Sequence, residues 1–143
     1  MDSLDQELID LLQQDASRSS IELAKQLHVS SITIRRRLKK LTQSGVLRIV
    51  GWVNYDKIGL PLFALIALHV VAEKIDSVMH LLNKRPEVTW VAATTGRFDL
   101  ILVAHFRATG ELSAFVQKEL PRLDGFKDSE TFICLNSLSF RDS

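Results

Sequence analysis

The amino-acid sequence predicts an α+β protein of two domains, a helical domain over residues 1–60 and an antiparallel-sheet domain over residues 61–143. Apolar residues recur at helical spacing in three short segments before residue 45, which predicts three helices. After residue 61 the predicted order is strand, helix, strand, strand, helix and strand, which is the ferredoxin-like βαββαβ arrangement. Residues 54–61 contain Gly59 and Pro61 among polar residues, as is typical of a linker.

The composition of the 143-residue chain is that of an ordinary globular protein, with 46% apolar and 24% charged residues and a formal net charge of +1. The single cysteine, Cys134, lies in an apolar run, so we expect a buried thiol and exclude an intramolecular disulfide. The N-terminus lacks the basic and apolar blocks of a signal peptide, and the longest apolar run, residues 60–72, is too short to span a bilayer. We therefore expect a cytoplasmic protein with no membrane association.

The first two helices are predicted over residues 3–15 and from Ser20 to Leu27. In the first helix the apolar positions at helical spacing are Leu4, Leu8, Leu11 and Leu12. Ser19 and Glu22 fit a capping box, which places the start of the second helix. The positions that we expect this second helix to bury are Ile21, Ala24 and Leu27.

The third helix is predicted over residues 31–44, with Ser30 as its N-cap and Gly45 directly after its C-terminus. Ile34, Leu38 and Leu41 fall on one stripe, which we assign to the core. Residues 28–30 form the turn before this helix, and three short helices with such a turn outline a helix-turn-helix. Residues 46–50 and 52–54 are then predicted as two short strands around Gly51, forming a wing that packs on the helices.

The third helix has the charge pattern of a DNA-binding surface. No acidic residue occurs between Glu22 and Asp56, whereas the cations in that stretch are Lys25, Arg35, Arg36, Arg37, Lys39, Lys40 and Arg48. A solvated helix face is the common alternative for charged helices, but this face has no acid to pair with its cations. We therefore predict that the helix binds the major groove of double-stranded DNA, and we expect the protein to be associated with the nucleoid.

Positions around the third helix divide into two groups of candidate DNA contacts. The base-reading candidates lie in the first turns: Ser31, Ile32, Thr33, Arg35 and Arg36. The phosphate candidates are Arg37, Lys39 and Lys40, and Gln43 shares the outer face. Arg37 lies close to the core edge, so it either braces the fold or reaches a phosphate.

The second domain is predicted to contain four strands and two helices. The strands are residues 62–72, 88–95, 99–106 and 129–140. The first helix spans residues 76–84, and the second, marked by Leu112, Phe115 and Val116, ends before Pro121 and Gly125. Gly96, Arg97 and Phe98 are predicted to form a tight turn between the second and third strands.

Both faces of this predicted sheet are apolar. In residues 100–106, one alternate set is Leu100, Leu102, Ala104 and Phe106, and the other is Ile101, Val103 and His105. The helices of a βαββαβ fold cover only one face, so a second apolar face requires another cover. We expect the same face of a second copy to cover it, giving a homodimer; the alternative is coverage by the N-terminal domain of the same chain.

Several short motifs occur across the two predicted domains. In the helical part they are Ser20-Ile21-Glu22-Leu23-Ala24 and Gly45-Val46-Leu47, and in the second domain they are Arg85-Pro86-Glu87-Val88, Thr95-Gly96-Arg97-Phe98-Asp99 and Glu130-Thr131. Together they resemble the Lrp/AsnC (leucine-responsive, feast/famine) family of transcriptional regulators. The chain departs from the family pattern twice. His28 replaces a usual glycine in the turn, although histidine tolerates a left-handed backbone, and Ile49-Val50 replace the usual glycine-aromatic pair of the wing.

The resemblance implies dimers formed through the sheet, assembled further into tetramers or octamers, and a small effector, typically an amino acid. That effector would bind near the turn between the second and third strands, where the matching positions are Thr94, Thr95, Gly96, Arg97, Phe98 and Asp99. The Asp99 carboxylate would hold an α-amino group and the backbone amides an α-carboxylate. The alternative is a plain hairpin turn.

The sequence contains no enzymatic motif that competes with this interpretation. The four histidines are scattered, and no metal-binding HxxxH, nucleophile elbow or phosphate-binding glycine loop occurs. We therefore expect no metal, no cofactor and no catalytic residue, and we expect His69 and His105 to be satisfied core histidines. Two alternatives stay open: a sirohaem-decarboxylase-like enzyme of the same architecture, and an architectural DNA-binding protein that responds to no ligand.

Overall fold

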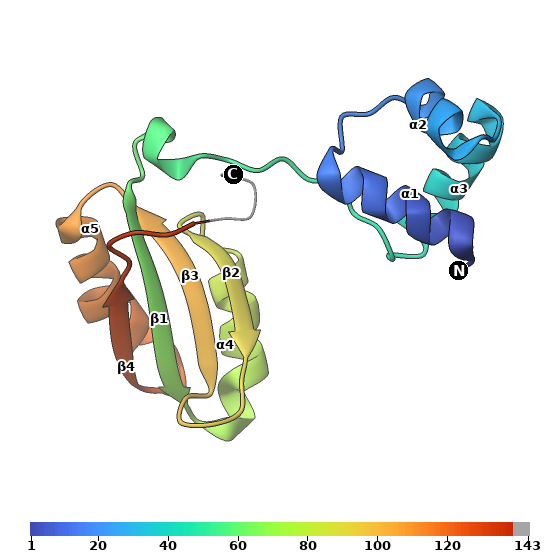
Figure 1. Cartoon of the computed structure of the whole chain (residues 1–143). Coiled ribbons are helices and arrows are strands. Elements are labelled where there is room, and N and C mark those ends of the chain that lie inside the picture. Colours follow the sequence, from blue (N-terminus) through green and yellow to red (C-terminus); the bar gives the residue numbers. More distant parts are fainter. Residues whose placement is uncertain (139–143) are drawn as a thin grey trace. The chain divides into compact units, whose positions relative to one another are not determined.

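A computed structural model describes residues 1–138 of the chain; residues 139–143, including the end of the predicted last strand, lie outside the described residues. Backbone contacts divide the chain into two compact units, Met1–Trp52 and Val53–Ser143 (Figure 1). Residues 53–60, which the prediction assigned to the first domain, are thus grouped with the second unit. None of the described helices is both long and apolar enough to cross a membrane.

The first unit consists of three short helices, each started by a side chain. They are α1 (Ser3–Gln14), α2 (Ser20–Leu27) and α3 (Ser31–Gln43). The predicted capping box of Ser19 and Glu22 and the predicted N-cap Ser30 are both confirmed. His28 ends α2 with φ 57°, ψ 41°, so it takes the left-handed conformation that the turn requires.

The core of the first unit joins all three helices. Its buried side chains are Leu8, Leu12, Leu23, Ala24, Ile34 and Leu41. The predicted burial of Ile21 is wrong, because 58% of its surface is exposed. Leu23 and Ala24 define the buried face of α2, and Ile21 lies about 160° around the helix from Leu23, at roughly 100° per residue.

The predicted two-stranded wing does not form. Residues 46–54 contain no strand, and no backbone hydrogen bond joins residues 48–53 to other parts of the described chain. Only the start of the segment is held, where the Leu47 N–H donates to the Leu41 carbonyl (3.1 Å). A two-stranded hairpin without a third strand or a packed face is only marginally stable in water. The apolar residues of this segment are therefore not sufficient for it to form strands.

The second unit confirms the βαββαβ order. Its main elements are β1 (Leu62–Val70), α4 (Ile75–Asn83), β2 (Val88–Ala93), β3 (Leu100–Phe106), α5 (Thr109–Ala114) and β4 (Phe126–Ile133). The strands form one antiparallel sheet in the order β2-β3-β1-β4 (Figure 1). The last strand was predicted over residues 129–140, whereas β4 begins at Phe126 and ends at Ile133. Cys134, which directly follows β4, is only half-buried.

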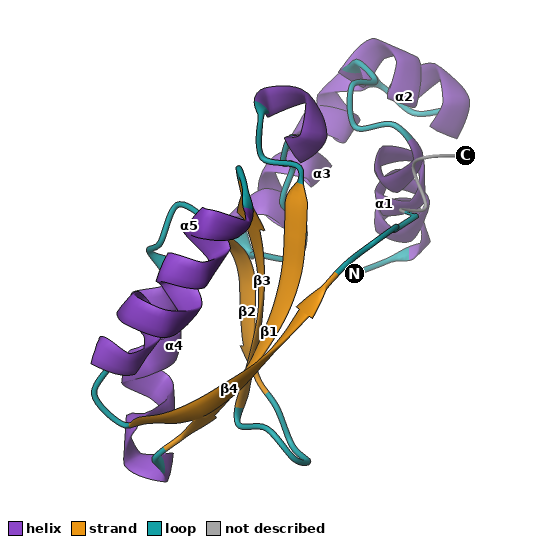
Figure 2. Cartoon of the chain, turned by 90° about the vertical axis from the view of Figure 1, so that its left-hand side faces the viewer, coloured by secondary structure: helices purple, strands orange, loops and turns teal. Residues whose placement is uncertain are grey.

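Both helices pack on the same side of the sheet (Figure 2). On this side the alternate residues Leu100, Leu102, Ala104 and Phe106 are buried, together with Val78 and Leu82 of α4 and Phe115 after α5. No α-helix covers the opposite side among the described residues of this unit, where the short 3-10 helix Tyr55–Ile58 only places Tyr55 on His105. We call this side the open face, and its members include Phe63, Leu65, Trp90, Ile101 and Val103.

Candidate DNA-binding helix and effector loop

The start of α3 is fixed by a local network of hydrogen bonds. The Ser30 hydroxyl accepts a hydrogen bond from the Thr33 N–H (3.2 Å), and the two side-chain hydroxyls lie 2.9 Å apart. Ile34 and Leu41 are buried, and Leu38 packs beside them, so the predicted core stripe is confirmed. Because these residues face the core, the opposite side of α3 faces solvent.

The solvent side of α3 presents one apolar side chain surrounded by cations. Ile32 is 74% exposed. The other exposed candidates are Arg35, Arg36, Lys39, Lys40 and Gln43, whereas Ser31 and Thr33 are half-buried. None of these four cations makes an ion pair with a described residue. Such a face is positively charged and free to meet an anionic partner.

Arg37 lies in a different environment from its neighbours. Its guanidinium donates to Asp2 (2.5 Å), the N-cap of α1, and to Asp5 (3.3 Å) in the first turn of that helix. Asp5 is only 5% exposed, although it is an acidic residue. The hydrogen bond from Arg37 lowers the pKa of Asp2, and the same bond raises the pKa of Arg37. Of the two roles predicted for Arg37, the structure therefore favours the brace between α1 and α3.

The predicted effector positions come together in one loop, residues 94–99, between β2 and β3. The loop is closed at its base, where the Thr94 N–H donates to the Asp99 carbonyl (3.0 Å) and the Thr94 hydroxyl donates to the Phe98 carbonyl (2.9 Å). It is longer than the predicted turn at residues 96–98. Gly96 has φ 98°, a backbone conformation that favours glycine. Within residues 1–138, the N–H groups of residues 95–98 have no backbone acceptor.

Asp99 connects this loop to the end of β1. Its backbone N–H donates to the Leu68 carbonyl (2.9 Å), and its Oδ2 accepts from the Val70 N–H (2.9 Å), next to the irregularity in the β1–β4 pairing. The other carboxylate oxygen accepts no hydrogen bond from the described residues. Asp99 therefore has a structural bond and one free acceptor beside the unpaired loop amides.

The two strand histidines differ from each other. Both ring nitrogens of His69 have partners, Asp128 and the Arg97 carbonyl, although the side chain is partly exposed. The His105 ring is stacked between Tyr55 (centroids 3.9 Å apart) and Phe63 (4.9 Å), and its buried Nδ1 has no hydrogen-bond partner among residues 1–138. Burial lowers the pKa of His105. The prediction of a satisfied histidine is thus wrong for His105.

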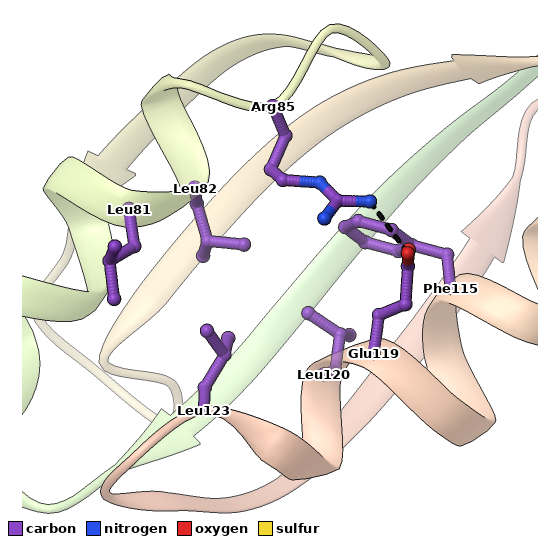
Figure 3. Close-up of a pocket in the computed structure, with 7 residues that line it drawn as sticks. All are labelled: Leu81, Leu82, Arg85, Phe115, Glu119, Leu120 and Leu123. Carbon is purple, nitrogen blue, oxygen red and sulfur yellow. Dashed lines mark hydrogen bonds and ion pairs between the residues drawn. The ribbon is translucent and has the colours of Figure 1, made fainter.

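A small apolar pocket lies between α4 and the segment that follows α5 (Figure 3). It has a volume of about 160 Å³, and its lining residues are Leu81, Leu82, Arg85, Phe115, Glu119, Leu120 and Leu123. Arg85 donates to Glu119 and to Glu87 (both 2.7 Å) at the rim, and its guanidinium lies over the Phe115 ring. These bonds raise the pKa of Arg85. Among the described residues, no three potential metal ligands come together.

Sequence reasoning missed the contacts that join distant segments. His69 and Asp128 are 59 positions apart, and Arg37 and Asp2 are 35 apart. For the contact between Arg37 and Asp2, the one sign available in the sequence was the capping box that Asp2 and Asp5 form at the start of α1. Nothing in the sequence indicated the contact between His69 and Asp128, because its partners meet only through the β1–β4 register.

Comparison with known proteins identifies both units. Residues 1–42 match the AsnC-type helix-turn-helix domain, and residues 63–143 match the Lrp/AsnC ligand binding domain. An uncharacterized HTH-type transcriptional regulator of Pyrococcus horikoshii is 35% identical over 94% of this chain and 91% of its own length. A related HTH-type regulator of Pyrococcus furiosus is 34% identical over the same shares.

Two solved structures have the same fold over nearly the whole chain. AsnC of Escherichia coli is 26% identical, with a TM-score of 0.85 over 99% of this chain and 96% of its own. A Neisseria meningitidis transcriptional regulator, solved as a complex with L-Met, is 25% identical, with a TM-score of 0.87 over 97% of this chain and 92% of its own. The two domain matches, the curated relatives and these structures agree: the chain belongs to the Lrp/AsnC family of transcriptional regulators.

Proposed function

We propose that this regulator binds double-stranded DNA by placing α3 in the major groove. The observation that supports this most strongly is the solvent side of α3, where four cations that make no ion pair with a described residue surround the exposed Ile32. A helix of this kind fits the major groove, and its first turns reach base edges. The lack of any acid on this side means that phosphates are its natural counter-charge.

The positions of the side chains suggest how the contacts divide. We assign base contacts to Arg35 and Arg36, which can each make a forked pair of hydrogen bonds to guanine. Ile32 is placed to contact a thymine methyl group, and Ser31 and Thr33 lie at the helix start beside it. Lys39, Lys40 and Gln43 lie further along the solvent side, where phosphate contacts are expected. Arg37 is assigned to positioning, because Asp2 and Asp5 occupy its guanidinium.

We further propose that the open face of the sheet forms a homodimer. Trp90 and Phe132 on this face are about half exposed, and Phe63, Leu65 and Val103 are only partly covered within one chain. Apolar surface of this extent is usually an interface. Two copies related by twofold symmetry would present two α3 helices to two half-sites, and such dimers could assemble further into tetramers or octamers.

The effector is proposed to be an amino acid bound at the loop of residues 94–99. The N–H groups of residues 95–98 and one oxygen of Asp99 have no partner among the described residues, and they suit an α-carboxylate and an α-ammonium group. The pocket between α4 and the segment that follows α5 is the second candidate location, because its apolar floor and charged rim also match an amino acid (Figure 3). The L-Met complex of the similar Neisseria regulator makes L-methionine the first probe.

DNA binding is tested by fluorescence anisotropy with a mixture of labelled duplexes over a range of salt concentrations. We expect affinity to fall steeply with salt, because cations that bind phosphates release counterions. Lys39→Ala should reduce the salt slope by about one charge. The control is Lys84→Ala, which removes an equal charge from the C-terminal end of α4 in the second unit and should leave the salt slope unchanged. Salt-independent binding, or equal effects of the two variants, would refute the assignment to α3.

The effector site is tested by calorimetry with L-methionine and then the other amino acids, using two variants. Asp99→Asn keeps an acceptor for the Val70 N–H but removes the charge, so it should weaken binding at least about fivefold. Leu123→Trp fills the pocket and should leave binding unchanged. If Leu123→Trp weakens binding and Asp99→Asn does not, the effector binds in the pocket instead of at the loop. Failure of every amino acid to bind or to alter DNA affinity would instead indicate a ligand-independent architectural protein.

A further inference from the structure

His69 holds together three segments at one end of the sheet. It is the next-to-last residue of β1, on the open face, and its register partner is Asp128 of β4. Its Nδ1 contacts the Asp128 carboxylate, and its Nε2 lies 2.5 Å from the carbonyl oxygen of Arg97 in the loop of residues 94–99. Phe98 of the same loop stacks on the imidazole, with centroids 4.6 Å apart and planes inclined by 21°.

The chemistry of these partners determines how many protons the imidazole must have. A backbone carbonyl oxygen and an ionised carboxylate can only accept hydrogen bonds. Neutral histidine has one N–H, so it can satisfy only one of the two acceptors, whereas the imidazolium has two N–H groups. The observed geometry, with an acceptor at each ring nitrogen, is therefore complete only when His69 is positively charged.

The charged groups around the ring favour the same protonation state. Asp128 faces it from β4 and Asp99 from the end of the loop of residues 94–99, and the Arg97 side chain is exposed and makes no ion pair with the described residues. The hydrogen bond to Asp128 raises the pKa of His69 most, followed by the bond to the Arg97 carbonyl, while desolvation opposes them. The imidazolium is thus stabilised where a neutral histidine would leave one acceptor unpaired.

We propose that His69, as an imidazolium, is the positioning residue of the effector loop: it ties the Arg97 carbonyl and the Phe98 ring to β1 and β4, and so sets the direction of the loop amides. The consequence for ligand binding rests on the proposed effector site. Because the folded clamp binds its proton more tightly than free histidine, the clamp is complete below the ordinary histidine pKa and is lost as pH rises through the raised value. Loop order and effector affinity should therefore fall together with rising pH.

The clamp itself is tested without any ligand, by NMR of the full chain between about pH 6 and about pH 9. The ring nitrogens of His69 should show the signature of a doubly protonated imidazole at the lower pH. Hydrogen exchange at residues 95–98 should accelerate as His69 loses its proton. Asp128→Asn should lower the pKa of His69 and shift this acceleration to lower pH. A neutral His69 throughout, or exchange in the loop that ignores its titration, would overturn the proposal.

The effect on the effector is tested by measuring L-methionine affinity over the same pH range. His69→Gln should weaken binding about two- to fivefold at the lower pH, the contribution expected of an exposed charged contact, and should remove the pH dependence. His80→Gln is the matched control, because His80 also contacts a backbone carbonyl (Asp76, 2.7 Å) but lies on α4. If no amino acid binds, the proposed effector site fails while the NMR result still decides the clamp. Unchanged pH dependence in His69→Gln would refute the coupling.

Discussion

Arg36 and Arg37 are adjacent in the sequence, yet the structure gives them opposite surroundings. Arg36 is exposed and makes no ion pair with a described residue, whereas Arg37 is held by Asp2 and Asp5. The reason is the 100° step between consecutive residues of a helix, which places one side chain toward solvent and the next at the edge of the core. The sequence predicted the exposed face correctly but left the role of Arg37 open, because its partners lie in another helix.

Substitution of the two arginines should therefore affect different properties, DNA binding for Arg36 and thermal stability for Arg37. Arg36→Ala should weaken DNA binding by about 1–3 kcal/mol and relax base preference, without changing thermal stability. Arg37→Ala should lower the melting temperature by breaking the brace to α1, while base preference at each position stays the same. Anisotropy on a panel of duplexes and calorimetric unfolding measure the two effects. Equal losses of stability would contradict the brace.

The brace also predicts a pH dependence. The pKa of Asp2 is lowered from its ordinary value of 3.8 by the hydrogen bond from Arg37. Its contribution to the free energy of unfolding is therefore present above pH 3.8 and is lost as pH falls through the lowered value. The difference in melting temperature between the wild type and Arg37→Ala should accordingly shrink in strong acid, and a difference that persists there would contradict the ion pair.

Elements with local signals were predictable, and elements that need a partner were not. The starts of α2 and α3 follow from Ser19 and Ser30, whose hydroxyls satisfy free N–H groups of the first helical turn. The segment of residues 46–54 has short apolar runs on both sides of Gly51, but strand pairing depends on a neighbour that the sequence pattern does not specify. The last strand was misplaced for a related reason, since its ends are set by the register with β1.

The cap of α3 gives a prediction for this element. Ser30→Ala should cost about 1 kcal/mol of unfolding free energy, because the Thr33 N–H loses its acceptor. It should also weaken DNA binding, since the first two turns of α3 contain the base-reading candidates. Ser19→Ala, which removes the equivalent cap from α2, should cost similar stability with a smaller loss of DNA affinity. Chemical denaturation and anisotropy on both variants make the comparison; a larger binding loss in Ser19→Ala would contradict the assignment.

At the scale of the whole molecule, the open face of the sheet leaves apolar side chains about half exposed, among them Trp90 and Phe132. Among the described residues of the second unit, Tyr55, stacked on His105, and Phe98, stacked on His69, cover part of this face. The sequence predicted such a face, because β1 and β3 at the centre of the sheet are apolar on both sides. Which surface covers it is a property of the assembly, and our proposal is a second copy.

Val103→Lys tests this interface. A lysine at this partly covered position is tolerated in a monomer, but a dimer would have to bury its charge without a partner, so dimer affinity should fall at least about tenfold. Sedimentation over a concentration series and the emission of Trp90, in a Trp52→Phe background, report the change. Leu81→Lys on the helix side is the control and should leave the dimer intact. An unaltered sedimentation profile for Val103→Lys would exclude this face as the interface.

The sequence by itself determined the three helices, the N-caps of α2 and α3, the βαββαβ order and the cationic side of α3, because helix starts, apolar periods and charge patterns are local properties. Only the tertiary structure decided that Arg37 braces α1, that the wing does not pair, and that His69 ties Asp128 to the loop of residues 94–99. Each of these depends on segments far apart in the chain meeting at hydrogen-bond distance, and no local pattern specifies such a meeting.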